Sequence, residues 1–63
     1  MNGIGITYIA LERAKKRIQF KINEMQALAD EATEDGDDPS AMAYHGVSDG
    51  LEEALRILEE EES

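Results

Sequence analysis

The sequence contains no cysteine and no tryptophan, and only one histidine and one proline. Without cysteine there can be no disulfide and no thiolate metal site. A single histidine leaves only carboxylate-rich metal sites, which rarely hold a fold together. A chain of 63 residues forms one domain with a small core. Cores of this size seldom supply more than about 3–5 kcal/mol unless a disulfide, a metal or another chain adds to them. Association with another chain is therefore the expected source of extra stability.

Basic side chains are scarce, with 6 against 15 acidic ones and a net charge of −9. This balance argues against direct nucleic-acid binding, which needs a basic face, and against binding to an anionic membrane. No apolar run approaches the roughly 18 residues that span a bilayer. Residues 1–11 are rather apolar but lack the charged start and cleavage site of a signal peptide. We expect a soluble protein of a reducing cytoplasm.

The first helix is expected over residues 7–33. Neither glycine nor proline occurs between Ile6 and Asp35, so helix formers dominate the segment. Apolar residues recur at alternating steps of three and four, with Lys21 as the polar break and Ile22 widening the stripe. The stripe consists of Leu11, Ala14, Ile18, Met25, Leu28 and Ala32.

A short turn is expected over residues 34–38. Gly36 suits the left-handed position that commonly closes a helix. Asp38 is the predicted N-cap of the next helix, with Pro39 at its first helical position, where a missing N–H costs nothing. Because the turn is short, the two helices are predicted to run antiparallel.

The second helix is expected over residues 39–61. Its apolar stripe, broadened by Leu55, consists of Tyr44, Val47, Leu51, Ala54 and Leu58. Gly46 and Gly50 interrupt it, each at a cost of about 1 kcal/mol relative to alanine. Either they allow another helix to approach closely, or the helix kinks there and Asp49 caps a second segment. We favour a continuous helix.

Two helices cannot enclose both apolar stripes. Several apolar residues lie off the stripes and need cover: Ile4, Ile6, Tyr8, Ile9, Phe20, Met42 and Ile57. The expected fold is therefore all-α, an antiparallel two-helix hairpin that dimerises through coiled-coil-like packing into a twofold four-helix bundle. The predicted core and oligomer interface comprises Leu11, Ile18, Ile22, Met25, Leu28, Tyr44, Val47, Leu51, Leu55 and Leu58.

The charges are segregated along the chain, since five of the six basic residues lie between Arg13 and Lys21. Antiparallel folding would bring them beside residues 52–60, which are acidic. Within the first helix, Glu12 and Lys16 have the spacing of a favourable pair. Two interpretations of the basic stretch are open. It answers the acidic second helix, or Arg13, Lys16 and Arg17 of two copies hold a phosphorylated small molecule.

No catalytic, cofactor or metal site is predicted. His45 and Asp49 are four residues apart but have no third ligand in a helical relationship. The carboxylates around the turn do not follow the twelve-residue calcium loop. The serines, including Ser48 near His45, lack the groups that would activate a nucleophile. We do not expect an enzyme.

Residues 22–63 contain fourteen carboxylates and a single basic residue, Arg56. Such a surface can imitate DNA and enter the basic groove of a nucleic-acid enzyme, although acidity also serves solubility. The N-terminal apolar residues and Phe20 could dock another protein unless a dimer buries them. The predicted partner-contact residues are Ile6, Tyr8, Ile9, Arg13, Arg17, Phe20, Asp49, Glu52 and Glu53.

Residues 43–58, with the pattern Tyr44-x-Gly46-x-x-Asp49-Gly50-Leu51 after an acidic glycine-containing turn, resemble the second helix of small helical-hairpin accessory proteins of bacteriophages. The resemblance brings no catalytic residues. It implies an accessory protein that binds and blocks a host factor, such as an antiviral-defence nuclease or helicase, in the cytoplasm of an infected bacterium. The alternatives are a sponge for a phosphorylated signal and a structural adaptor of an assembly.

Overall fold

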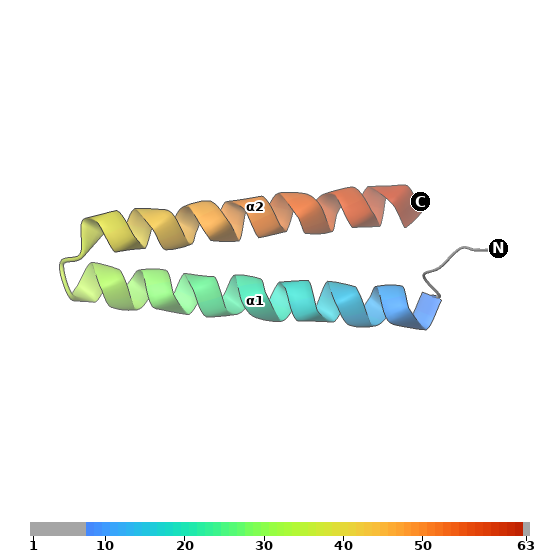
Figure 1. Ribbon diagram of the computed structural model, residues 1–63, viewed down its shortest axis with the longest axis horizontal. Coiled ribbons are helices and arrows are strands. Elements are labelled where there is room, and N and C mark those ends of the chain that lie inside the picture. Colours follow the sequence, from blue (N-terminus) through green and yellow to red (C-terminus); the bar gives the residue numbers. More distant parts are fainter. Residues whose placement is uncertain (1–7, 63) are drawn as a thin grey trace.

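The structure is a computed structural model that describes residues 8–62. It consists of two helices, α1 (Tyr8–Glu34) and α2 (Asp38–Glu62), which pack side by side in antiparallel directions (Figure 1). The hairpin is a rod of 51 × 16 × 16 Å. The predicted all-α hairpin is confirmed. The expectations for Ile4, Ile6 and Thr7 concern residues outside the described range.

Helix α2 runs without interruption through Gly46 and Gly50. The continuous helix is therefore confirmed, and a second segment capped by Asp49 does not exist. Close approach of α1 does not explain the glycines either, because no heavy atom of the described chain outside the local backbone lies within 4 Å of a Cβ built at either position.

Within the turn, Gly36 has a φ of 77°, the left-handed conformation expected of it. Its N–H donates to the carbonyl of Thr33 at 3.1 Å, and the N–H of Asp37 donates to the carbonyl of Ala32 at 2.8 Å. These two bonds form the Schellman motif, which satisfies carbonyls at the end of a helix. The prediction for Gly36 is confirmed.

The cap of α2 is one residue earlier than predicted. The carboxylate of Asp37 accepts a hydrogen bond from the N–H of Ser40 at 3.3 Å, and its carbonyl accepts the N–H of Ala41 at 3.0 Å. Asp37 is thus the N-cap, and the prediction of Asp38 was wrong. Asp38 and Pro39 occupy the first two helical positions, where an N–H has no partner within the helix.

The helices meet along a regular seam, in which buried and half-buried residues alternate at steps of three and four. On α1 the seam contains Leu11, Lys15, Ile18, Ile22, Met25, Ala29 and Ala32, and on α2 it contains Ala41, Tyr44, Ser48, Leu51, Leu55 and Leu58. This arrangement matches the seven-residue repeat of a coiled coil.

The seam and the predicted stripes use different sets of helical positions, which we call frames. Ala14, Val47 and Ala54 belong to the predicted stripes but are exposed. Both frames share every second member, such as Ile18 and Leu51. They differ at the others, where the observed frame buries Ile22 instead of Lys21 and places Leu55 instead of Ala54 in the seam. At other positions it places Ala29 and Ser48 in the seam instead of Leu28 and Val47, which stay partly exposed in the single hairpin.

Candidate interaction surfaces

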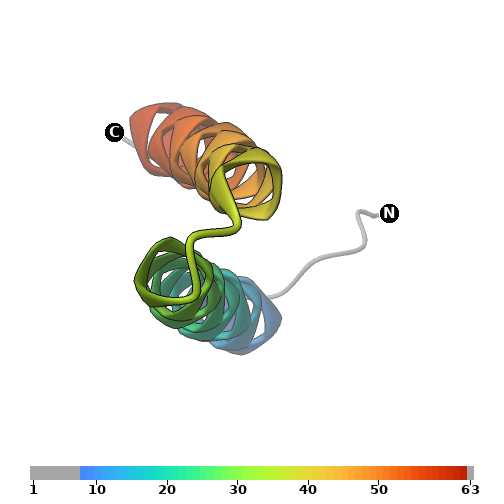
Figure 2. The same ribbon diagram turned by 90° about the vertical axis from the view of Figure 1, so that its left-hand side faces the viewer.

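The hairpin is a single layer of two helices, so no other element of residues 8–62 covers either of its broad faces (Figure 2). The seam residues of each helix form pairs three positions apart, such as Lys15 with Ile18 on α1 and Ser48 with Leu51 on α2. In a seven-residue repeat, the residue just before such a seam pair and the residue just after it lie on opposite sides of the seam. Because the helices are antiparallel, the residues that precede the seam pairs lie on the same side in both helices. The hairpin therefore has two different faces.

One face is polar. The residues that follow the seam pairs are Glu12, Gln19, Gln26 and Thr33 on α1, and His45, Glu52 and Glu59 on α2. They include no aliphatic or aromatic side chain. We call this the polar face; its composition is that of a surface that faces water.

The opposite face is largely apolar. The residues that precede the seam pairs are Ala14, Lys21 and Leu28 on α1, and Ser40, Val47 and Ala54 on α2. Ile57 lies at the outer edge of this face by its helical position. The exposed fractions of Val47 and Ile57 are 50% and 49%. We call this the apolar face.

A hollow of about 440 Å³ lies on the apolar face, lined by Arg17, Ile18, Phe20, Lys21 and Leu51. It joins α1 to the seam residue Leu51 of α2, so a furrow runs between the helices here. A smaller hollow of about 130 Å³ near the turn is lined by Leu28, Glu31, Ala32, Asp35, Asp37, Ser40 and Tyr44. The apolar face is thus hollowed near the turn and near the middle of the rod.

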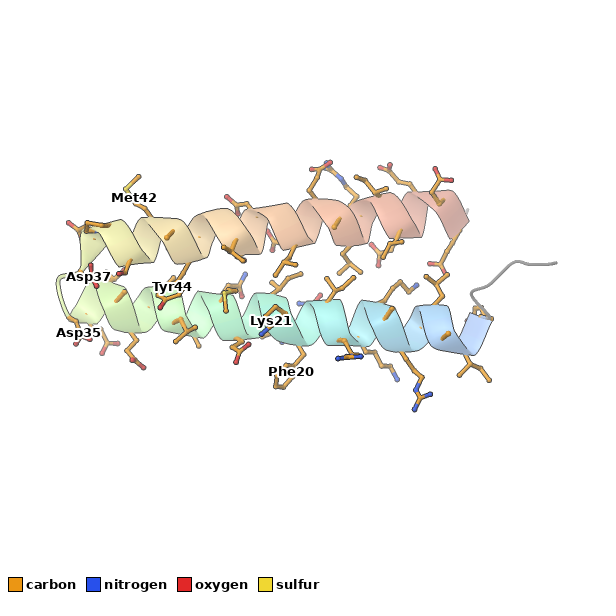
Figure 3. The ribbon with its side chains drawn as sticks, viewed as in Figure 1. Phe20, Lys21, Asp35, Asp37, Met42 and Tyr44 are labelled. Atoms are coloured by element: carbon orange, nitrogen blue, oxygen red, sulfur yellow. The ribbon has the colours of Figure 1, made fainter. Side chains whose placement is uncertain are left out.

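Further apolar side chains project from the outer sides of the helices. Phe20 points away from α2 and Met42 away from α1, whereas Tyr44 points toward α1 (Figure 3). The exposed fractions of Phe20 and Met42 are 72% and 74%. Among the predicted contact residues, Tyr8 and Ile9 are also exposed, at the start of α1.

Charge divides the hairpin along its length. Residues 22–50, which we call the turn half, contain eight acidic side chains and no basic one. The remaining residues form the open half, with seven acidic and six basic side chains. The net charges are therefore −8 and −1. Asp35 and Asp37 mark the acidic end of the rod at the turn (Figure 3).

Lys15 links the two helices at the open end. Its Nζ lies 2.6 Å from a carboxylate oxygen of Glu62 and 2.9 Å from one of Glu12. The hydrogen bond to Glu62, followed by that to Glu12, raises the pKa of Lys15 above its usual range. The expected Glu12–Lys16 pair is replaced by Glu12–Lys15, since Lys15 also reaches across to the second helix.

The other basic residues contribute little to contact between the helices. Lys21 pairs with Glu24 at 2.7 Å within α1. Within the described range, no ion pair involves Arg13, Lys16 or Arg17. These three residues, for which a ligand or a partner was predicted, are exposed. Their charges are not paired with a carboxylate of the described range.

On α2, Arg56 forms an ion pair with Glu53 one turn earlier. The hydrogen bond from Arg56 lowers the pKa of Glu53, and the same bond raises the pKa of Arg56. Asp49, Glu52 and Glu53, all predicted partner contacts, are exposed on α2. Any partner that binds Glu53 would compete with Arg56.

His45 and Asp49 are both exposed. Within residues 8–62, no group of three or more histidine, aspartate or glutamate side chains is arranged to hold a metal ion. Neither α1 nor α2 has the length of apolar sequence needed to cross a membrane. Apart from Ser48, the buried residues of the described chain are Ile22 and three alanines.

Fold and surface together define an acidic two-helix hairpin with one polar and one apolar face. No family model, curated protein or solved structure matches the chain.

Proposed function

We propose that this chain is a homodimeric binding protein that acts by contact with another protein. One observation carries the proposal: the hairpin exposes a largely apolar face together with Phe20 and Met42. An apolar surface beside charged residues is typical of a protein–protein interface. A four-helix bundle made of two copies accounts for part of this surface, and a second protein for the rest.

The proposed target is a host protein with a basic groove, such as a defence nuclease or helicase, which the hairpin inhibits. The turn half supports this choice, because it presents eight carboxylates with no basic side chain among them. Such a surface attracts a basic groove at long range and can occupy the place of DNA. The resemblance of residues 43–58 to phage accessory proteins points to the same role.

Affinity capture from bacterial lysate with matched variants tests the proposal. One variant neutralises three exposed carboxylates of the turn half, Glu31→Gln, Glu34→Gln and Asp35→Asn. The control neutralises Glu59, Glu60 and Glu61 in the open half in the same way. Asp37 is left intact because it caps α2.

We expect the wild type and the control to recover one stoichiometric protein, and the turn-half variant to lose it. Purified target should bind DNA less tightly when the hairpin is added. If the wild type recovers no stoichiometric protein at low and at moderate salt, the proposed inhibitor role is wrong. Equal capture by both variants would contradict the acidic target surface.

A second candidate is a sponge for a phosphorylated small molecule. It is favoured by Arg13, Lys16 and Arg17, which have no ion pair among the described residues, and by the hollow beside Arg17 and Lys21. Nucleotides at millimolar concentration should then raise the melting temperature through preferential binding to the folded state. Absence of any shift across a panel of nucleotides would exclude this candidate.

A further inference from the structure

We infer that the apolar face is the docking surface for a second copy of this chain, and that the two hairpins stack in reversed directions. The turn half of each copy then lies against the open half of the other. The inference rests on the proposed homodimer and specifies its face and its order.

The composition of the two faces selects the apolar one. A helix in a bundle needs a third apolar position in each seven-residue repeat, beside the two that form the seam with its first neighbour. Ala14 and Leu28 supply that position on α1, and Val47 and Ala54 supply it on α2. The equivalent positions on the polar face are all polar or charged.

The seam itself is incompletely covered in the open half. Ile18, Leu51, Leu55 and Leu58 belong to the open half and are only half-buried, whereas the buried residues lie between Ile22 and Ser48. A second hairpin on the apolar face would cover the exposed sides of these residues. The hollow beside Phe20 and Leu51 gives its side chains a place to enter.

The size of the face requires overlap along its whole length. The rod measures 51 Å by 16 Å, so one face presents about 800 Å², which equals the roughly 800 Å² that each partner buries in a stable interface. If only one end of each rod overlapped, the buried area would fall to about half of that. Full overlap leaves two orders to choose between.

Charge selects the reversed order. With the turns at the same end, eight carboxylates of one copy would lie beside eight of the other, with no basic side chain in either turn half. With the turns at opposite ends, each acidic turn half faces an open half that contains all six basic residues. Arg17 and Lys21 line the apolar face within that open half. Like charges in contact oppose association, and opposite charges fix its register.

The face is tested with Val47→Glu and a matched control, His45→Glu, which adds the same side chain two residues earlier on the polar face. Sedimentation equilibrium should give a mass of two copies for the wild type and for the control. An unpaired charge at a buried interface should raise the dimer dissociation constant of Val47→Glu at least about tenfold. Circular dichroism at high protein dilution checks that both variants keep the helical hairpin. Equal dissociation constants would overturn the choice of face.

The order is tested with a spin label on Glu34→Cys, which is the only cysteine in the chain and lies exposed at the turn. In the reversed order, pulsed dipolar spectroscopy should give a distance between the two labels that approaches the 51 Å length of the rod. Labels close together would overturn the reversed order but leave the homodimer standing. A wild-type mass of one copy at micromolar concentration would overturn the homodimer itself. Capture of the target protein is a separate readout.

Discussion

The two halves of the hairpin are built from the same two helices but use different side chains. In the turn half, most of the seam consists of small residues, and Ala29, Ala32, Ala41 and Ser48 are buried by the facing helix alone. In the open half, the seam consists mainly of Ile18, Leu51, Leu55 and Leu58, which the facing helix covers only in part. Apart from Ile22, which is also buried, the larger seam side chains leave apolar surface for a further layer, whereas the small ones complete their contact within one hairpin.

The two ends of the rod also differ in the interactions that connect the helices. At the turn, the Schellman motif and the Asp37 cap satisfy backbone groups of both helices with local hydrogen bonds. At the open end, the described link between the helices is the pairing of Lys15 with Glu62. Local hydrogen bonds at the turn do not depend on a partner chain, and those between neutral backbone groups depend little on salt, but an exposed ion pair is screened by salt. The turn half thus defines the hairpin, and the open half is suited to association.

The largest effect is expected where the two halves meet. Ile22 has an exposed fraction of 1% and is the largest fully buried side chain of the described residues. Ile22→Ala should cost about 2–5 kcal/mol through lost burial and a cavity. That loss is comparable with the whole stability of a chain of this size, about 3–5 kcal/mol. Urea unfolding followed by circular dichroism measures it.

Val47→Ala is the control for Ile22→Ala, since Val47 is half exposed in the single hairpin. Both variants are compared at one protein concentration, because the proposed dimerisation would contribute to apparent stability. If Val47→Ala were as destabilising as Ile22→Ala, burial within the hairpin would not be what holds the two halves together.

The cap of α2 gives the next largest effect and tests the local order of the turn half. Asp37→Ala should cost about 1 kcal/mol by removing the acceptor for the N–H of Ser40, and Asp37→Asn should keep most of the stability. Asp38→Ala should cost less, because Asp38 contributes only its charge near the helix N-terminus. A larger loss in Asp38→Ala than in Asp37→Ala would restore Asp38 as the cap.

The same turn shows how far the sequence could predict the fold. Gly36 was predictable, because few other residues adopt the left-handed conformation. The cap was misplaced by one residue because Asp37 and Asp38 are both good caps, and proline is tolerated at either of the first two helical positions. The hydrogen bonds from the N–H groups of Ser40 and Ala41 to Asp37 decide between them.

The seam frame was harder to predict than the turn, because two frames share Leu11, Ile18 and Leu51. The choice between them depends on the rotation of both helices together, which no single stripe determines. Lys15 lies in the seam because its long aliphatic stem packs there while its ammonium group reaches Glu62. The surfaces were predictable as residue types, but their division into a polar and an apolar face required the observed frame. The identity of a partner depends on the residues of another molecule, so this sequence alone does not predict it.

A smaller effect of opposite sign is expected at Gly46. A Cβ at this position meets no atom of the described chain within 4 Å outside the local helix backbone. Gly46→Ala should therefore stabilise the hairpin by up to about 1 kcal/mol through higher helix propensity. The measurement is the urea midpoint under dilute conditions that favour the single hairpin. A loss of stability there would mean that Gly46 is needed for packing or backbone geometry within the single hairpin.

The smallest effect is expected at the open end and appears in alkaline solution. Pairing with Glu62 and Glu12 raises the pKa of Lys15 above its ordinary value of 10.5. Protonated Lys15 thus stabilises the folded state fully below pH 10.5, and this contribution is lost as the pH rises through the higher folded-state pKa.

Lys15→Met keeps the apolar stem but abolishes this dependence. The difference in unfolding free energy between wild type and Lys15→Met should shrink from pH 8 to above pH 10.5. A difference that stays constant over this range would contradict the contribution of the Lys15 pairing. The Lys15 pair joins full opposite charges, whereas the Asp37 carboxylate accepts from a neutral N–H. Added salt should therefore weaken the Lys15 effect more than the Asp37→Ala effect; equal salt sensitivity of both would remove the distinction between the two ends.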